Sequence, residues 1–295
     1  MFEVSGSILN CLTVFARCAI LFLFASLDSA LAQFSPALLQ NDSYWGDGKA
    51  EFDLYDAQLM RTGQPRHCEM IMTLLRDTFT PELFADSTPA SKAGPVSGIR
   101  MSQMFSAPLG LTVEQQSLSI FWNLHGDLYQ ALLVTASGRG HRVIKAETIP
   151  DIKSFCFESQ DDHGQAGGTD LLHFDNQTHV LYDELPLRVR TIEFSKSAGE
   201  FDIQLATPLA DPPAFKPAKV SYKVNERSIN VEVLQGNARD HFTLDPDFPF
   251  LLREWKARDG SSFKLKNSLK VDLSNYTKNG DRERALKDPM LRHPD

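Results

Sequence analysis

The sequence has few cysteines, no excess of positive charge and one pronounced apolar run. Its 295 residues include 4 cysteines and carry a formal net charge of −8. A mildly acidic chain argues against a nucleic-acid partner, because nucleic acids bind to a basic protein face. The apolar run lies near the N-terminus, and no other run approaches the ~20 residues that a membrane span needs.

The common catalytic signatures are also missing. The sequence contains no Gly-x-Ser-x-Gly segment, no His-Glu-x-x-His segment and no phosphate-binding loop. The segment Gly46–Lys49 has the composition of such a loop, but it lacks the four-residue spacer and the Ser or Thr after the lysine. We therefore interpret it as a turn, expect no cofactor, and favour binding over catalysis.

The first 32 residues have the features of a secretory signal. Arg17 precedes the short apolar segment Cys18–Ala25, and Ala30 and Ala32 supply the small residues that a signal peptidase reads. We expect cleavage after Ala32 and a soluble periplasmic or secreted protein without a membrane span. An N-terminal anchor that is not cleaved is the alternative.

Cleavage would leave two cysteines, Cys68 and Cys156. In an oxidising compartment they could form one disulfide across a loop of about 88 residues, which would stabilise the fold by roughly 4–5 kcal/mol. Two free thiols are the alternative, because the sequence does not show whether the two strands are neighbours.

Turn signals separate many short apolar runs after residue 44. Examples are His125–Asp127, Asn176-Gln177 and Asp259-Gly260. This spacing is typical of antiparallel strands joined by hairpins. We predict a mainly β fold, a long antiparallel meander that forms a curved open barrel or a two-layer sandwich, as a single domain over residues 44–274.

Alternation of apolar and polar residues predicts which side chains are buried. Phe52 and Leu54 alternate with Glu51 and Asp53, so we predict that the two apolar residues face the core and that solvent explains the two carboxylates. The segment Ser228–Leu234 alternates in the same way, with its β-branched residues inward.

Four segments depart from the strand pattern. Residues 184–192 repeat apolar side chains with helical spacing after Pro186, which predicts a short helix. Residues 207–217 contain four prolines, which predicts a linker or a stiff strap across a sheet edge rather than a central strand. Residues 33–43 are expected to be an irregular leader, and residues 275–295 a polar, disordered tail.

The densest cluster of possible metal ligands lies between residues 163 and 179. Its members are His163, Asp170, His173, Asp175 and His179. Imidazole and carboxylate groups suit zinc. His173, Asp175 and His179 would meet if residues 176–178 formed a three-residue hairpin loop, whereas the commoner two-residue loop would leave a solvated hairpin.

Several segments resemble a group of exported bacterial β-rich proteins of unknown function. The group opens with a Trp-x-Asp-Gly-x-Ala-Glu segment, which Tyr44–Asp56 matches, and Thr62–Arg66 and Met70–Leu75 follow it in the same order. Ser154–Cys156 stands where the group has a Trp-Cys step, with Phe in place of Trp, and Tyr182–Leu185 is also similar. The resemblance implies an exported β protein and brings no known activity or catalytic residue.

These observations lead to three functional expectations. The first is a non-enzymatic periplasmic protein that binds an apolar ligand or a partner with a concave sheet face. The second is a metal-assisted hydrolase that uses His173, Asp175 and His179. The third is a structural or envelope-assembly protein that acts on an envelope protein through its sheet edges.

Overall fold

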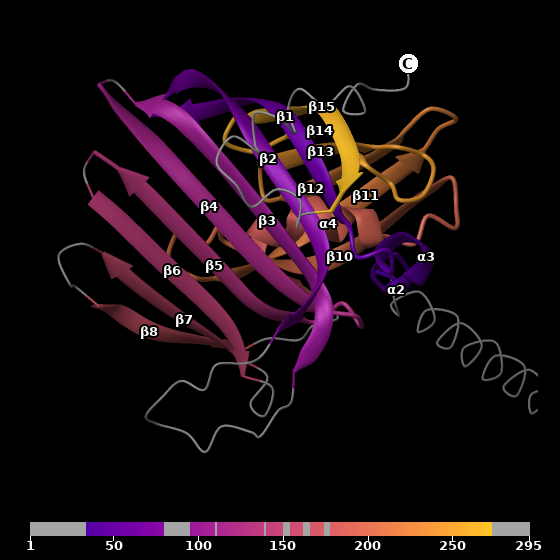
Figure 1. The fold of residues 1–295 in the computed structure, drawn as a ribbon, viewed down its shortest axis with the longest axis horizontal. Helices are drawn as coiled ribbons and strands as arrows, with labels where there is room; N and C mark the ends of the chain where they lie inside the picture. Colours follow the sequence, from indigo (N-terminus) through magenta and orange to yellow (C-terminus); the bar gives the residue numbers. More distant parts are fainter. Residues whose placement is uncertain are drawn as a thin grey trace, which may run out of the picture. The chain divides into compact units, whose positions relative to one another are not determined.

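The computed structural model describes residues 34–79, 95–109, 111–138, 140–149, 154–161, 166–173 and 178–272. In this part of the chain fifteen strands form one sheet (Figure 1). The strands are β1 Ala50–Arg61, β2 Gln64–Phe79, β3 Val96–Leu109, β4 Thr112–Asn123, β5 Leu128–Ser137, β6 Gly140–Ile149, β7 Ser154–Asp161, β8 Ala166–His173, β9 His179–Val180, β10 Ala198–Ala206, β11 Phe215–Val224, β12 Ile229–Gln235, β13 Ala238–Leu244, β14 Leu252–Lys256 and β15 Ser262–Val271. The prediction of a mainly β fold is therefore confirmed.

The chain starts in the middle of the sheet and fills it in two passes. β1 to β8 run in order to one edge, β9 begins at the other edge, and β15 ends beside β1. All neighbouring strands are antiparallel except β9 and β10. A flat sheet of this size would separate its edges by roughly 65 Å at about 4.8 Å per strand. His173 of β8 and His179 of β9 are six residues apart, which spans at most about 20 Å, so the sheet must curve into an open barrel.

The sheet curves around a short helical segment. This segment consists of η2 Tyr182–Glu184, α4 Leu185–Arg188 and η3 Val189–Thr191. It confirms the helix predicted near 184–192, with Pro186 in the first turn as expected. Every residue from Leu185 to Thr191 is buried, including both arginines. The segment is thus part of the core rather than a surface connection.

The chain before β1 is more regular than the sequence suggested. Residues 33–43 were expected to be irregular, but α2 spans Ala37–Gln40 and α3 spans Asp42–Trp45. The Asn41 side chain caps α3 by accepting a hydrogen bond from the Tyr44 backbone N–H. The buried Trp45 indole donates to the Leu38 carbonyl oxygen over 2.7 Å, which fixes the two turns together.

The alternation in β1 predicts the wrong environment for Glu51, Asp53 and Phe52, although Leu54 is buried as predicted. Glu51 and Asp53 are 1% and 0% exposed and face the barrel interior, whereas Phe52 is only half-buried. Apolar residues also occur on the outer face here, so the period of two does not say which face is inward. In β12 the prediction is confirmed, because Ile229, Val231 and Val233 are all buried.

The proline-rich segment 207–217 combines a strap and the start of a strand. From Thr207 to Ala214 it is a loop that contacts other elements: the Leu209 N–H donates to Asp183, and Arg142 of β6 donates to the Ala210 carbonyl oxygen. β11 already begins at Phe215 and includes Pro217, contrary to the prediction. β11 pairs with β12 only from Lys219 onward, so Pro217 sits where one side of the strand is unpaired.

Two of the expected regions lie outside the described residues, namely the signal and the 275–295 tail. Within the described ranges no helix has both the length and the apolar character to cross a membrane.

Gly98 of β3 provides a test of the sheet register. A Cβ atom at this position would lie 1.9 Å from the Trp122 carbonyl oxygen and 2.6 Å from the Phe121 ring. We expect Gly98→Ala to lower the free energy of unfolding by about 1–3 kcal/mol, measured by chemical denaturation. Ser97→Ala, at the exposed neighbouring position, is the control. Equal stability of the two variants would contradict the pairing of β3 with β4.

Candidate functional site

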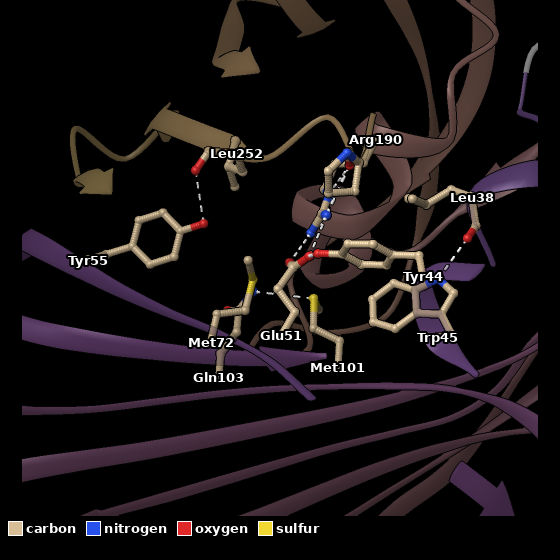
Figure 2. Close-up of polar contacts among 11 residues, drawn as sticks. Leu38, Tyr44, Trp45, Glu51, Tyr55, Met72, Met101, Gln103, Arg190 and Leu252 are labelled. Atoms are coloured by element: carbon tan, nitrogen blue, oxygen red, sulfur yellow. Dashed lines mark hydrogen bonds and ion pairs between the residues drawn. The ribbon is translucent and has the colours of Figure 1, made fainter. Parts of the chain in front are cut away.

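The most deeply buried ion pair joins β1 to the helical segment. Arg190 Nη1 lies 2.6 Å from Glu51 Oε1, and Nη2 lies 3.0 Å from Oε2, which makes a two-pronged contact. The Tyr44 hydroxyl donates to Glu51 over 2.5 Å, and Arg190 also donates to the Pro249 carbonyl oxygen. Figure 2 shows Tyr44 and Arg190 converging on the Glu51 carboxylate.

The electrostatics of this pair follow from burial and contact. Burial alone would raise the pKa of Glu51, but the Arg190 guanidinium outweighs it and holds that pKa below its ordinary value. Burial likewise disfavours the charge on Arg190, yet Glu51 raises its pKa overall. Removing one partner of such a buried pair leaves the other charge uncompensated, which costs about 3–5 kcal/mol.

Asp53 lies beside this pair and forms no ion pair of its own within the described residues. It is fully buried, in register with Met72 of β2 and Ser268 of β15, and Ser268 and Glu51 are the polar groups that influence its carboxyl. Burial raises the pKa of Asp53 well above its ordinary value, and the negative charge of Glu51 raises it further. Both effects favour the protonated, neutral form of Asp53.

Two further polar links hold the helical segment to the sheet. Arg188 pairs with Glu184, donates to the Gly126 carbonyl oxygen and lies 4.0 Å from the centre of the Trp122 ring. At the start of the segment, the Tyr182 hydroxyl donates to Asp240 over 2.8 Å. Asp240 also accepts from Arg258, in the turn before β15. The segment is thus attached at β1, at the β4–β5 hairpin and at β13.

These interior clusters hold the fold together rather than form a site for a ligand. Glu51, Asp53, Glu184, Arg190 and Asp240 are each at most 1% exposed. A diffusing molecule cannot reach their charged groups in this structure. The helical segment occupies the concave inner face of the sheet, where the sequence predicted a ligand. A ligand site must therefore lie on another face.

The outer face of β2 to β5 carries an open groove of about 600 Å³. Ligand sites in proteins usually measure about 300–1,000 Å³. Its apolar lining comes from Ile71, Met104, Val134 and Ala136, one or two residues from each of three strands. Met104 is 47% exposed, an unusual exposure for a large apolar side chain. This groove is the candidate ligand site.

Strand register explains why these side chains align. Ile71 of β2 pairs with Met104 of β3, Met104 pairs with Ser117 of β4, and Ser117 pairs with Val134 of β5. Residues in register share a face of the sheet. They therefore form a row across four strands, about 14 Å long at about 4.8 Å per step.

Sequence reasoning missed this row, although a signal was present. Met70–Met72 and Ala131–Val134 are continuous apolar runs, with no polar residue to alternate. Such runs place apolar side chains on both faces of a sheet. One face of β2 and β5 packs against the core. The apolar side chains on the opposite face of these strands therefore form an apolar outer surface.

His173 and His179, two of the three predicted metal ligands, lie on strands that do not pair with each other. His173 ends β8 at one edge of the sheet, and His179 begins β9 at the other, so the predicted hairpin between them is wrong. Asp175 lies outside the described residues. Among the described residues no three or more His, Cys, Asp or Glu side chains are grouped so that they could hold a metal ion.

The two cysteines are separate free thiols in the structure. Cys68 lies on β2 and Cys156 on β7, with β3 to β6 between them. The predicted disulfide is therefore not formed, because the strands are not neighbours. Burial raises the pKa of Cys68 to about 11 and also raises the pKa of Cys156, so both thiols are protonated at neutral pH.

The chain is thus a mainly β protein with an open, curved sheet. A scan against models of known protein families and a search of curated proteins gave no match. Among solved structures, it is similar to a β-barrel-like protein of the domain of unknown function DUF1849 from Brucella abortus, at 10% identity over 76% of this chain and 98% of that chain, with a TM-score of 0.41. It is also similar to a DUF1089 family protein from Pseudomonas aeruginosa, at 14% identity over 60% of this chain and 95% of that chain, with a TM-score of 0.36. No activity or ligand follows from either.

The neutral state of Asp53 can be tested by the pH dependence of stability. Asp53 has a higher pKa in the folded than in the unfolded protein, so folding favours its protonated form. Its contribution to stability is therefore fully present below the unfolded pKa and is lost as pH rises. Between the unfolded and the folded pKa the loss is about 1.4 kcal/mol per pH unit. We expect Asp53→Asn, which cannot ionise, to remove this contribution. The variant should gain stability over the wild type between pH 5 and pH 8, as urea denaturation across that range would measure.

Asp56→Asn serves as the control, because Asp56 is exposed on the outer face of the same strand. If Asp53→Asn and the wild type lose stability in parallel as pH rises, Asp53 is not the neutral acid described above.

Proposed function

We propose that this chain is an exported, non-catalytic binding protein that holds a single aliphatic chain, such as the acyl chain of a lipid, in the groove on the outer face of β2 to β5. The observation that supports the proposal is the row Ile71–Met104–Ser117–Val134, which is apolar at three of its four positions, aligned by strand register and open on one side. Export is supported by the signal-like first 32 residues, in which Arg17 precedes Cys18–Ala25 and small residues follow.

The shape of the groove favours an elongated ligand. The row crosses four strands in a line of about 14 Å, whereas each strand contributes only one position to it. A bulky, rounded ligand would need depth, but this site is a shallow groove on a sheet. Met104 is unbranched and half-exposed, so it can adapt its shape to a flexible chain.

The charges around the groove favour a ligand that is uncharged where it lies on the row. Glu69 borders the groove and pairs with Lys266 over 3.0 Å, so this border has charges of both signs. Ser117 supplies a neutral polar group within the row, and Ser106 and Gln115 supply two more beside it. These groups can orient a ligand without demanding a charge on it.

Binding of an aliphatic probe tests the proposal. We expect a dansyl-labelled undecanoic acid to bind the wild type with blue-shifted fluorescence. Met104→Asp should weaken binding about tenfold or more, because it places a charge on the apolar row. Met104 is exposed, so the variant should still fold, which circular dichroism would verify.

The matched control is Asn230→Asp, which adds the same charge at an exposed position of β12, far along the sheet order from β3. Equal affinity of wild type and Met104→Asp would contradict the proposed site. Failure of the wild type to bind the probe would contradict the proposed ligand.

A further inference from the structure

The row that lines the groove continues beyond Val134. Val134 of β5 pairs with Val143 of β6, and Val143 pairs with Gln160 of β7. Residues in register share a face of the sheet, so Val143 lies on the outer face as the next member of the row. Its neighbour Ile144 is buried in the core, as alternation along a strand requires, whereas Val143 is only half-buried. The row is therefore one apolar residue longer than the groove described above.

The two ends of this row differ in exposure and polarity. Toward β1 it continues into Leu54, which pairs with Ile71, but Leu54 is only 4% exposed and Ile71 only 8%. A ligand can therefore touch Ile71 but cannot extend over Leu54. Toward β7 the row reaches Gln160, which is polar and exposed. The row is thus closed at its β1 end and open, beside an amide, at its β7 end.

The accessible length of the row corresponds to a definite length of hydrocarbon. Ile71 and Val143 lie on β2 and β6, four strand steps apart, which is about 19 Å at about 4.8 Å per step. The row as far as Val134 measures about 14 Å. An extended hydrocarbon advances about 1.3 Å per carbon, because its C–C bonds of about 1.5 Å follow a zigzag. A dodecanoyl chain therefore extends from Ile71 to Val134, and a hexadecanoyl chain extends to Val143.

The ends of the row also determine the direction of such a chain. The methyl end suits Ile71, because a polar group placed there would lie against hydrocarbon and lose its hydrogen bonds to water. The polar end suits Gln160, whose amide can both donate to and accept from an ester or a hydroxyl group. The opposite orientation would leave both ends of the ligand beside unsuitable groups.

We propose that the groove selects a long acyl chain of about sixteen carbons, with its methyl end at Ile71, its last apolar contact on Val143 and its polar end at Gln160. This inference rests on the proposed function, because it extends the same groove by one strand. It adds a division of roles along the row. Met104 contacts a chain of any length, whereas Val143 contacts only a long chain and therefore determines the preferred length.

Displacement of the dansyl probe by monoacylglycerols of different chain length tests this selection, at concentrations below micelle formation. We expect hexadecanoylglycerol to bind the wild type at least about tenfold more tightly than dodecanoylglycerol, because its additional methylenes lie on Val143. Icosanoylglycerol should bind no more tightly than hexadecanoylglycerol, because its further carbons pass Gln160. Val143→Asp should abolish the advantage of hexadecanoylglycerol and leave the affinity for dodecanoylglycerol within about twofold of the wild type. That retained affinity also shows that the variant is folded.

Val113→Asp is the matched control, because Val113 is 51% exposed on β4 and does not line the groove. Gln160→Leu lengthens the apolar row and should make icosanoylglycerol bind more tightly than hexadecanoylglycerol. Equal affinity of the wild type for the two shorter esters would overturn the inference and leave the proposed function standing, as would a Val143→Asp variant that weakens both esters alike. A wild type that binds neither the esters nor the dansyl probe would overturn the proposed function, and this inference with it.

Discussion

The contact between Glu51 and Arg190 is the constraint on which the rest of the structure depends. It is a two-pronged ion pair in the barrel interior, between residues 139 positions apart in the chain. The inner face of the curved sheet needs side chains to pack against, and the helical segment supplies them. Glu51 and Tyr44 fix that segment against β1, at the centre of the strand order. A buried ion pair of this kind can add little to the net free energy of unfolding. It nevertheless excludes alternative positions for the helical segment, because any shift would leave two buried charges unpaired.

The two faces of the sheet consequently serve different purposes. The inner face is occupied by the helical segment and the core, and its ionised groups are sealed from solvent. The outer face of β2 to β5 carries a mostly apolar row that the core does not need. The outer face of these strands is therefore the face that a ligand can reach.

Much of the fold was predictable from the sequence because its signals are local. Hairpin turns such as Asp259-Gly260, the alternation in β12 and the helical spacing after Pro186 depend on residues close together in the chain. The inward orientation of Glu51 was not predictable, because its cause is Arg190, in a segment that reads only as a short helix. Likewise, the apolar runs in β2 and β5 indicate two apolar faces, but only the strand register shows that their outer residues align.

The separation of His173 from His179 has a similar origin. A turn signal between two short strands normally predicts a hairpin. Here the chain instead passes from one edge of a fifteen-stranded sheet to the other, which depends on the curvature of the whole sheet rather than on the turn. The curvature of the sheet therefore determines which residues lie close together, and the ion pair between Glu51 and Arg190 helps to fix that curvature.

A double-mutant cycle on Glu51→Gln and Arg190→Met tests this account most directly. Each single variant should lose about 3–5 kcal/mol of unfolding free energy, because each leaves a buried group of the pair without its partner. The double variant should lose clearly less than the sum of the two, with a coupling of at least about 2 kcal/mol. Additive losses would show that the two residues do not act as a pair, and would contradict the central role assigned to their contact.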